Sequence, residues 1–262
     1  MSTAPTRLDL SPRPGAAPRA AMLRAQTVME LRLQTRNAEQ VLLTMVIPLV
    51  LLVLGARASD IVDLGPGRTI DIITPGILAL AVLSTSFTSL AIATGFERRY
   101  GIIKRLGASP LPRWGLLFGK IGAVVIMQVL QLTILSAVGF MLGWEPQGGV
   151  VAAAQMVVLI ILGTAAFGAL GLLIAGTLRA EATLAVANLV YVLLLVGGGL
   201  LVPMSRYPDA AAHVLQLLPS GALGQGLRDT FAGNGPSAFA TVVLLVWAVC
   251  ASLLVSRTFK WE

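Results

Sequence analysis

The sequence predicts an all-α integral membrane protein with six transmembrane helices, an interfacial helix before the first span and short helices outside the spans. Three observations support this prediction. Only 12% of the 262 residues are charged, whereas a soluble domain has about 25%, and the mean hydropathy is +0.85. Six apolar runs approach or exceed the length needed to cross a bilayer. Lys and Arg gather in alternate connections between these runs, as the positive-inside rule requires.

Residues 1–18 are rich in Pro, Ala and Arg and lack the apolar core of a secretory signal. We expect a disordered cytoplasmic tail there, followed by one membrane domain over residues 19–262. Residues 18–40 carry apolar side chains at helical spacing between charged ones. The apolar positions are Met22, Ala25, Met29 and Leu33. This pattern is typical of a helix lying in the membrane interface, and a plain cytoplasmic helix is the alternative.

Six predicted spans follow in order. They cover residues 41–56, 72–96, 114–142, 150–176, 183–202 and 237–256. All except the first reach the ~20 residues that a bilayer core requires. The first is about 24 Å long at ~1.5 Å per residue, so residues 38–40 are needed to extend it, and Pro48 is expected to kink it.

The positive charges predict the orientation. With a cytoplasmic N-terminus, 15 of the 19 Lys and Arg residues fall on the cytoplasmic side and 4 on the outer side, while the acidic residues divide evenly. Both termini and residues 97–113 are therefore expected in the cytoplasm. The high isoelectric point then reflects membrane topology, and we expect membrane lipids but no nucleic acid as partners.

Residues 203–236 join the last two spans on the outer side. This connection is long and only weakly polar, with repeated Leu and Val among its residues. It is therefore predicted to contain one or two short helices that lie on or dip into the outer leaflet.

Several chemical signatures are absent. Residues 115–120 read Gly-Leu-Leu-Phe-Gly-Lys, which is too short between its glycines for a phosphate loop and is followed by Ile121. The one histidine, His213, and the one cysteine, Cys250, lie far apart, so we predict no catalytic site, no metal site and no cofactor on this chain. Lys120 lies near the cytoplasmic end of its span, and we expect it to extend to the lipid headgroups.

Residues 97–114 form the longest highly charged segment between two spans. On a helical wheel its first ten residues separate into two faces. One face holds Glu97, Arg98, Gly101, Lys104 and Arg105, and the other holds Arg99, Tyr100, Ile102, Ile103 and Leu106. The pattern predicts a short amphipathic helix, ended by Gly107 and Pro110, that docks on a partner protein. A solvated positive-inside loop is the alternative.

Residues 96–114, Phe-Glu-Arg-Arg-Tyr-Gly-Ile-Ile-Lys-Arg-Leu-Gly-Ala-Ser-Pro-Leu-Pro-Arg-Trp, closely resemble the segment between the second and third spans of ABC-2 type transporter permeases. The likeness is closest to the bacterial drug-exporter branch typified by the daunorubicin-resistance permease. The layout over residues 20–262 also resembles that family.

The resemblance implies the membrane subunit of an ABC exporter in the bacterial cytoplasmic membrane. Such a chain is not itself an ATPase. It pairs with a second copy or a close relative and with two separate ATP-binding subunits, which hold ATP and Mg²⁺. The resemblance also implies that residues 97–106 form the coupling helix, whose docking residues are Glu97, Arg98, Arg99, Tyr100, Gly101, Lys104, Arg105 and Leu106.

The cargo is less well defined by the sequence. The polar residues of the second and fifth spans are candidates for a translocation path between two protomers. These residues are Ser84, Thr85, Thr88, Asn188 and Tyr191. Hydrogen bonding of each hydroxyl to its own helix is the alternative. The weakly polar spans favour an amphipathic drug, a lipid or a glycan-type cargo over a highly charged one.

Two other functions fit the same topology. A membrane assembly or immunity factor would use residues 97–106 to bind a partner without moving cargo. An ion-coupled secondary carrier would need an ionisable group within the membrane, and the spans show no acidic residue near their middle.

Overall fold

The computed structural model describes residues 17–57, 67–108, 112–235 and 237–259, and all regular structure within these ranges is helical. The elements in order are α1 (Arg19–Arg36), α2 (Ala38–Arg57), α3 (Thr69–Leu83), the π-helix η2 (Ser84–Ser89), α4 (Leu90–Arg99), α5 (Ile102–Gly107), α6 (Arg113–Met141), α7 (Gly149–Thr177), α8 (Ala180–Gly197), the 3₁₀ turn η3 (Met204–Arg206), α9 (Asp209–Gln216), α10 (Pro219–Phe231) and α11 (Ala238–Thr258). The all-α fold is confirmed. The predicted N-terminal tail lies almost wholly outside the described residues.

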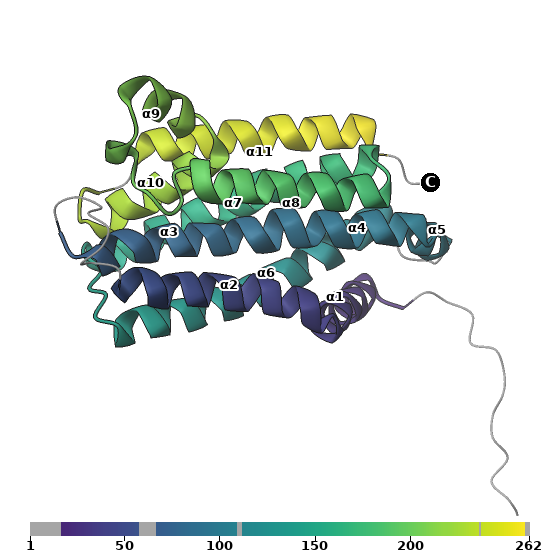
Figure 1. Ribbon diagram of the computed structural model, residues 1–262. Coiled ribbons are helices and arrows are strands. Elements are labelled where there is room, and N and C mark those ends of the chain that lie inside the picture. Colours follow the sequence, from purple (N-terminus) through teal and green to yellow (C-terminus); the bar gives the residue numbers. More distant parts are fainter. Residues whose placement is uncertain (1–16, 58–66, 109–111, 236, 260–262) are drawn as a thin grey trace, which may run out of the picture.

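The long helices lie side by side (Figure 1), with α1 and α5 at one end of the bundle and α9 at the other. We call these the basic end and the opposite end. Within the described ranges, five helical segments are long and apolar enough to cross a membrane: Thr69–Arg99, Trp114–Met141, Gly149–Thr177, Ala180–Gly197 and Ala238–Thr258. The first predicted span corresponds to α2, whose described apolar part, Thr44–Arg57, is shorter and contains Pro48. Its shortness agrees with the sequence analysis.

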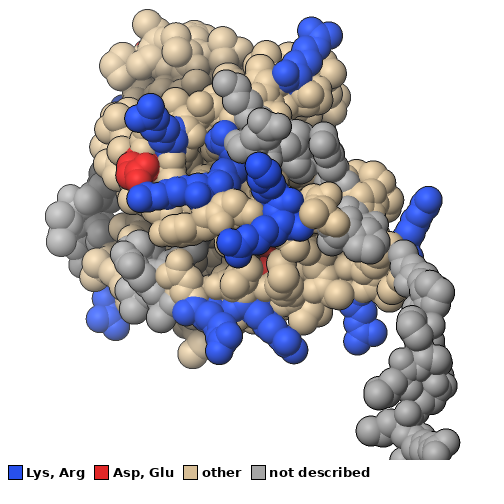
Figure 2. All heavy atoms as spheres, turned by 90° about the vertical axis from the view of Figure 1, so that its right-hand side faces the viewer, with Lys and Arg blue, Asp and Glu red and all other residues tan. Residues whose placement is uncertain are grey.

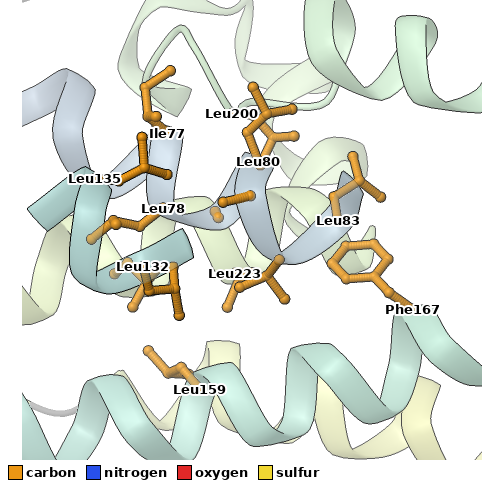
Figure 3. Close-up of a cluster of buried hydrophobic side chains, with 14 of the residues drawn as sticks. Ile77, Leu78, Leu80, Leu83, Leu132, Leu135, Leu159, Phe167, Leu200 and Leu223 are labelled. Atoms are coloured by element: carbon orange, nitrogen blue, oxygen red, sulfur yellow. The ribbon is translucent and has the colours of Figure 1, made fainter. Parts of the chain in front are cut away.

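The centre of the bundle is α3 together with η2 and α4. Within this segment 83% of the most apolar window is buried, against 17% for α8, so α3 is the core helix and α8 a peripheral one. Figure 3 shows the core, in which leucines of α3 meet side chains from α6, α7 and α10. Its labelled members are Ile77, Leu78, Leu80, Leu83, Leu132, Leu135, Leu159, Phe167, Leu200 and Leu223. Helices with all backbone groups bonded internally are the structure that such apolar segments require in lipid.

The fifth predicted span is shorter than expected. Its helix, α8, ends at Gly197 and not near residue 202. The backbone of Gly199 has a φ of +72°, which glycine adopts without steric cost and which ends the helical path. The next residues turn back toward the core, where Leu200 is fully buried.

The connection between the last two spans folds as two short helices, α9 and α10, as predicted. Pro219 occupies the first turn of α10, where its missing N–H costs no helical hydrogen bond. Almost all of α10 is buried, because it packs against α3, α7 and α11. The opposite end of the bundle is therefore filled by a helix that does not itself span.

Candidate functional site

The predicted docking helix is two pieces, not one. Residues 97–99 are the last turn of α4, and α5 begins only at Ile102. Gly101 separates them with a φ of +67°, a left-handed conformation that glycine adopts readily. A side chain at Gly101 would meet no atom within 4 Å, so its role in the structure is to make the turn. The prediction of one amphipathic helix over residues 97–106 was wrong, while its end at Gly107 is confirmed.

The three residues at the end of α4 do not share one exposed surface. Glu97 is buried. Arg98 donates hydrogen bonds to the carbonyls of Ala175 and Leu178 at the C-terminal end of α7, where the helix dipole favours a cation. Arg99 is half-exposed and forms an ion pair with Glu181 at the start of α8. The end of α4 is thus tied to the turn between α7 and α8.

The exposed part of the segment is smaller than predicted. Besides Arg99, the exposed docking candidates are Tyr100, which is 62% exposed, and Lys104 and Arg105 on α5. The other face of α5 is anchored in the bundle, because Ile103 is buried and Leu106 is half-buried. Figure 2 looks onto the basic end, where Lys and Arg side chains far outnumber the acidic ones. The basic end therefore presents Tyr100 at the end of α4 and two cations on the short, anchored helix α5.

A buried ionic cluster lies beneath α5. Lys120 of α6 lies 3.0 Å from Glu30 of α1 and forms a second ion pair with Glu97 of α4. The three side chains are only 8%, 4% and 10% exposed. The expectation that Lys120 extends to the lipid headgroups was wrong, because two carboxylates hold its ammonium group inside the protein. We call Glu30, Lys120 and Glu97 the ionic clamp.

The run of Ser and Thr residues from Ser84 to Ser89 in the second span lies in the π-helix η2. Such a segment places its side chains differently from an α-helix and is frequent at functional sites. Ser84 donates to the carbonyl of Ala81, the back-bonding that the sequence left open. Thr85 donates to Oε1 of Gln131 at 2.5 Å, and Gln131 in turn donates to the carbonyl of Thr44. Ser84 and Thr85 are therefore buried and hydrogen-bonded, while Thr88 is half-buried.

A second polar contact lies beside the first. Gln128 accepts a hydrogen bond from Thr164 at 2.8 Å and approaches the hydroxyl of Ser86 at 3.5 Å. Together with Gln131, it forms a neutral polar band across α2, η2, α6 and α7. No role for these two glutamines could be predicted from the sequence, because their partners lie on other helices.

The two path candidates on α8 do not join this band. Asn188 is exposed on the outer surface of α8, surrounded by exposed Leu184, Leu189 and Val192. Tyr191 is half-buried and packs against the core. The five predicted path residues thus separate into a set on η2 and a set on α8.

The opposite end contains a buried cation that the sequence analysis placed in an outer loop. Arg228 of α10 is 7% exposed and donates to the carbonyls of Ile72, Gly199 and Leu200. Burial lowers the pKa of Arg228 to about 10, which leaves it charged at neutral pH. The neighbouring Asp229 is partly buried, and desolvation raises the pKa of its carboxyl. Arg228 therefore joins α10 to the start of α3 and to the segment that follows α8.

Within the described residues, no three His, Cys, Asp or Glu side chains gather in a way that could hold a metal ion. Cys250 is exposed on α11. The features that gather charged and polar groups are the basic end with its ionic clamp, the polar band and the Arg228 contact.

The comparisons with known proteins agree with this arrangement. A family described as "ABC-2 family transporter protein" matches residues 65–257, which is well over half of the chain. YvfS of Bacillus subtilis (strain 168), a protein assigned as a transport permease, is 25% identical over 188 residues, covering 69% of this chain and 73% of YvfS. The family match covers the five described spans, apart from Thr258 at the end of α11, and leaves out α2. This chain therefore belongs to the ABC-2 family of transporter proteins and is a membrane permease subunit of that family.

Proposed function

We propose that this chain is the membrane-spanning subunit of an ATP-driven exporter in the bacterial cytoplasmic membrane. Two separate ATP-binding subunits, which hold ATP and Mg²⁺, dock on the basic end. The observation that carries this proposal is the exposure of Tyr100, at the end of α4, and of Lys104 and Arg105 on α5, whose other face is anchored. A seated helix transmits a partner's rigid-body movement to α4 and α6, which flank it in the chain.

The charge distribution supports a cytoplasmic basic end. The described Lys and Arg residues at that end lie on α1, α4, α5, α6, α11 and the turn before α8. Those at the opposite end are Arg57, Arg68, Arg206 and Arg228. The positive-inside rule then orients both termini toward the cytoplasm. ATP, and therefore a subunit that binds it, is present only on the cytoplasmic side of the membrane.

The outer surface of α8 supports pairing with a second permease copy, identical or related. Asn188 is exposed within an apolar surface, and a carboxamide facing lipid tails lacks hydrogen-bond partners. A second copy packed there would supply partners for Asn188 and cover the exposed leucines. Thr88 and Tyr191, which are half-buried on neighbouring helices, would then lie near the seam and the cargo path.

The polar band supports an amphipathic cargo such as a drug, a lipid or a glycan-type molecule. Thr85, Gln128, Gln131 and Thr164 are neutral groups that bond to one another within the bundle, whereas the charged side chains of the ionic clamp lie at the basic end. Neutral polar groups among apolar walls suit a weakly polar molecule better than a highly charged one.

The docking proposal is tested by purifying the tagged chain from its native membrane and measuring the ATP-binding subunit that it retains. We expect Lys104→Glu/Arg105→Glu to lose that subunit while the chain still inserts and elutes as the parent does. Arg24→Glu/Arg257→Glu is the matched control, because both residues are exposed at the same end but lie off α5. Equal retention by both double variants would remove the docking assignment.

The transport proposal is tested in inside-out vesicles with daunorubicin and with a fluorescently labelled phosphatidylethanolamine. Uptake that requires ATP and persists with a protonophore supports the exporter. Uptake that survives ATP depletion and collapses with the protonophore would instead support the ion-coupled carrier, to which buried Glu97 would be relevant. Partner binding with no ATP-dependent movement of either probe would favour the assembly factor.

A further inference from the structure

The ionic clamp connects three helices that are far apart in the sequence. Nζ of Lys120 on α6 donates to Oε2 of Glu30 on α1 at 3.0 Å and also pairs with Oε2 of Glu97 on α4. The other carboxylate oxygen of Glu30 accepts from Gln26 at 2.8 Å, so both of its oxygens are bonded. Two buried carboxylates that share one ammonium group fix the relative position of the three helices that carry them.

Close packing between α1 and α6 reinforces this position. A side chain at Gly119 would overlap Cγ of Gln26, and one at Gly122 would lie 3.0 Å from the side chain of Thr27. The two glycines therefore let α1 approach the backbone of α6 closely. A helix seated this tightly at two successive points has little freedom to slide.

The docking segment lies directly over the clamp. Ile103 and Leu106 of α5, with Leu116 of α6, line the same small space as Glu30, Glu97 and Lys120. A displacement of α5 therefore changes the space that the clamp side chains line. Through Glu97 it reaches α4, and through Glu30 it reaches α1.

The charges of the clamp show which ion pair can be removed at the smaller cost in stability. The clamp has two carboxylates and one ammonium, and Arg98 is directed away from it toward the end of α7. Removing the charge of Glu30 leaves Lys120 and Glu97 as a matched pair. Removing Lys120 leaves two buried carboxylates facing each other, which is far more costly.

We propose that the ionic clamp makes α1 part of the moving unit, so that α1 travels with α6 and the end of α4 when the ATP-binding subunits displace α5. This proposal rests on the proposed function, because that function supplies the displacement. Glu30 and Lys120 are positioning residues, which act by holding α1 on α6. Helix α1 is then a third element that moves at the basic end, in addition to the spans on either side of α5.

A cysteine pair, one on α1 and one on α6, reports directly on whether the two helices stay in contact. The Cβ of Thr27 lies 3.6 Å from the position of a Cβ at Gly122, within the 3.5–4.5 Å that a disulfide requires. Thr27→Cys/Gly122→Cys is built in a Cys250→Ser chain, so that no other thiol remains. The rate of disulfide formation is measured in lipid nanodiscs, with the ATP-binding subunits, before and after trapping with Mg-ATP and vanadate.

We expect rapid cross-linking in both nucleotide states. Adding Glu30→Gln should slow disulfide formation by about tenfold, which is equivalent to ~1.4 kcal/mol in the free energy that holds α1 on α6. Arg32→Gln, an exposed change on the same helix, is the matched control and should keep the parent rate. Lys120→Arg should also keep it, because a guanidinium can still pair both carboxylates.

The oxidised cysteine chain gives the functional readout. If α1 and α6 move together, locking them by a disulfide leaves ATP hydrolysis by the complex unchanged. Inhibition by the disulfide, loss of cross-linking on trapping, or an unchanged rate in Glu30→Gln would each overturn the proposal. If the parent chain binds no ATP-binding subunit, the proposed function fails and the coupling role fails with it. The cross-linking rates of the chain alone would still decide whether Glu30 holds α1 on α6.

Discussion

Replacing Lys120 by methionine tests whether the ionic clamp stabilises the basic end. Methionine keeps most of the side chain's length and apolar stem but removes the ammonium group. The carboxylates of Glu30 and Glu97, which are 4% and 10% exposed, would then face each other without a cation. Removing one partner from a buried ion pair costs about 3–5 kcal/mol. At roughly 2–4 °C per kcal/mol for a chain of this size, the melting temperature should fall by about 6–20 °C.

The assay is thermal unfolding of the purified chain in detergent, followed by tryptophan fluorescence. Lys104→Met is the matched control, because it makes the same chemical change at an exposed position of α5 and should alter stability by less than about 0.5 kcal/mol. Adding Glu30→Gln and Glu97→Gln to Lys120→Met removes both orphaned charges and should recover most of the loss. A Lys120→Met chain that melts like the control, or no recovery in the triple variant, would refute the reasoning.

Two glycines give further predictions with matched controls. Gly101→Ala should cost about 1–2 kcal/mol, because its φ of +67° is unfavourable for any side chain, and should speed amide exchange in α5 by roughly tenfold in hydrogen–deuterium mass spectrometry. Gly107→Ala, also with open space around it but a helical backbone, should leave exchange unchanged or slower. Gly76→Ala would overlap the carbonyl of Leu200 and come within 2.6 Å of Arg228, so the melting temperature should fall by several degrees. Gly168→Ala meets only ordinary contacts at 3.7 Å and should not lower it comparably.

The positions of the long helices followed well from the sequence because they depend on local properties. Each span is a continuous apolar run, and a bilayer fixes the length that such a run must have. The end of α5 at Gly107 was also predicted, since a glycine after the last periodic residue is a helix-end signal. The early end of α8 was missed because Gly197–Gly199 stands within an apolar run that still reads as a span.

The structure of residues 97–106 could not be predicted from the local sequence pattern. The helical wheel assumed one helix through Gly101, and that assumption placed Glu97 beside Lys104 on a water-facing surface. The positive φ of Gly101 ends α4 first, so Glu97 belongs to a span and turns inward. Its partners, Lys120 and Glu30, are distant in sequence. The available signal was a lysine inside an apolar run, which calls for a carboxylate partner on another helix.

The polar residues of the second span illustrate the same difficulty for the cargo path. Whether Thr85 lines a channel or bonds a neighbour depends on Gln131, which no local pattern associates with it. The π-helix at η2 has no simple sequence signature either. A second permease copy would add contacts on α8 that the single chain does not contain, so Asn188 remains a prediction.

The most direct test of the central claim is a photo-crosslinker placed at Tyr100, which is 62% exposed beside α5. The same crosslinker at Leu217, which is 56% exposed at the opposite end, is the control. Illumination of native membranes should join the Tyr100 position to an ABC ATP-binding subunit, identified by mass spectrometry, and leave the Leu217 position without that adduct. An ATP-binding subunit captured at both positions, or at neither, would contradict the docking of an ATPase on the basic end.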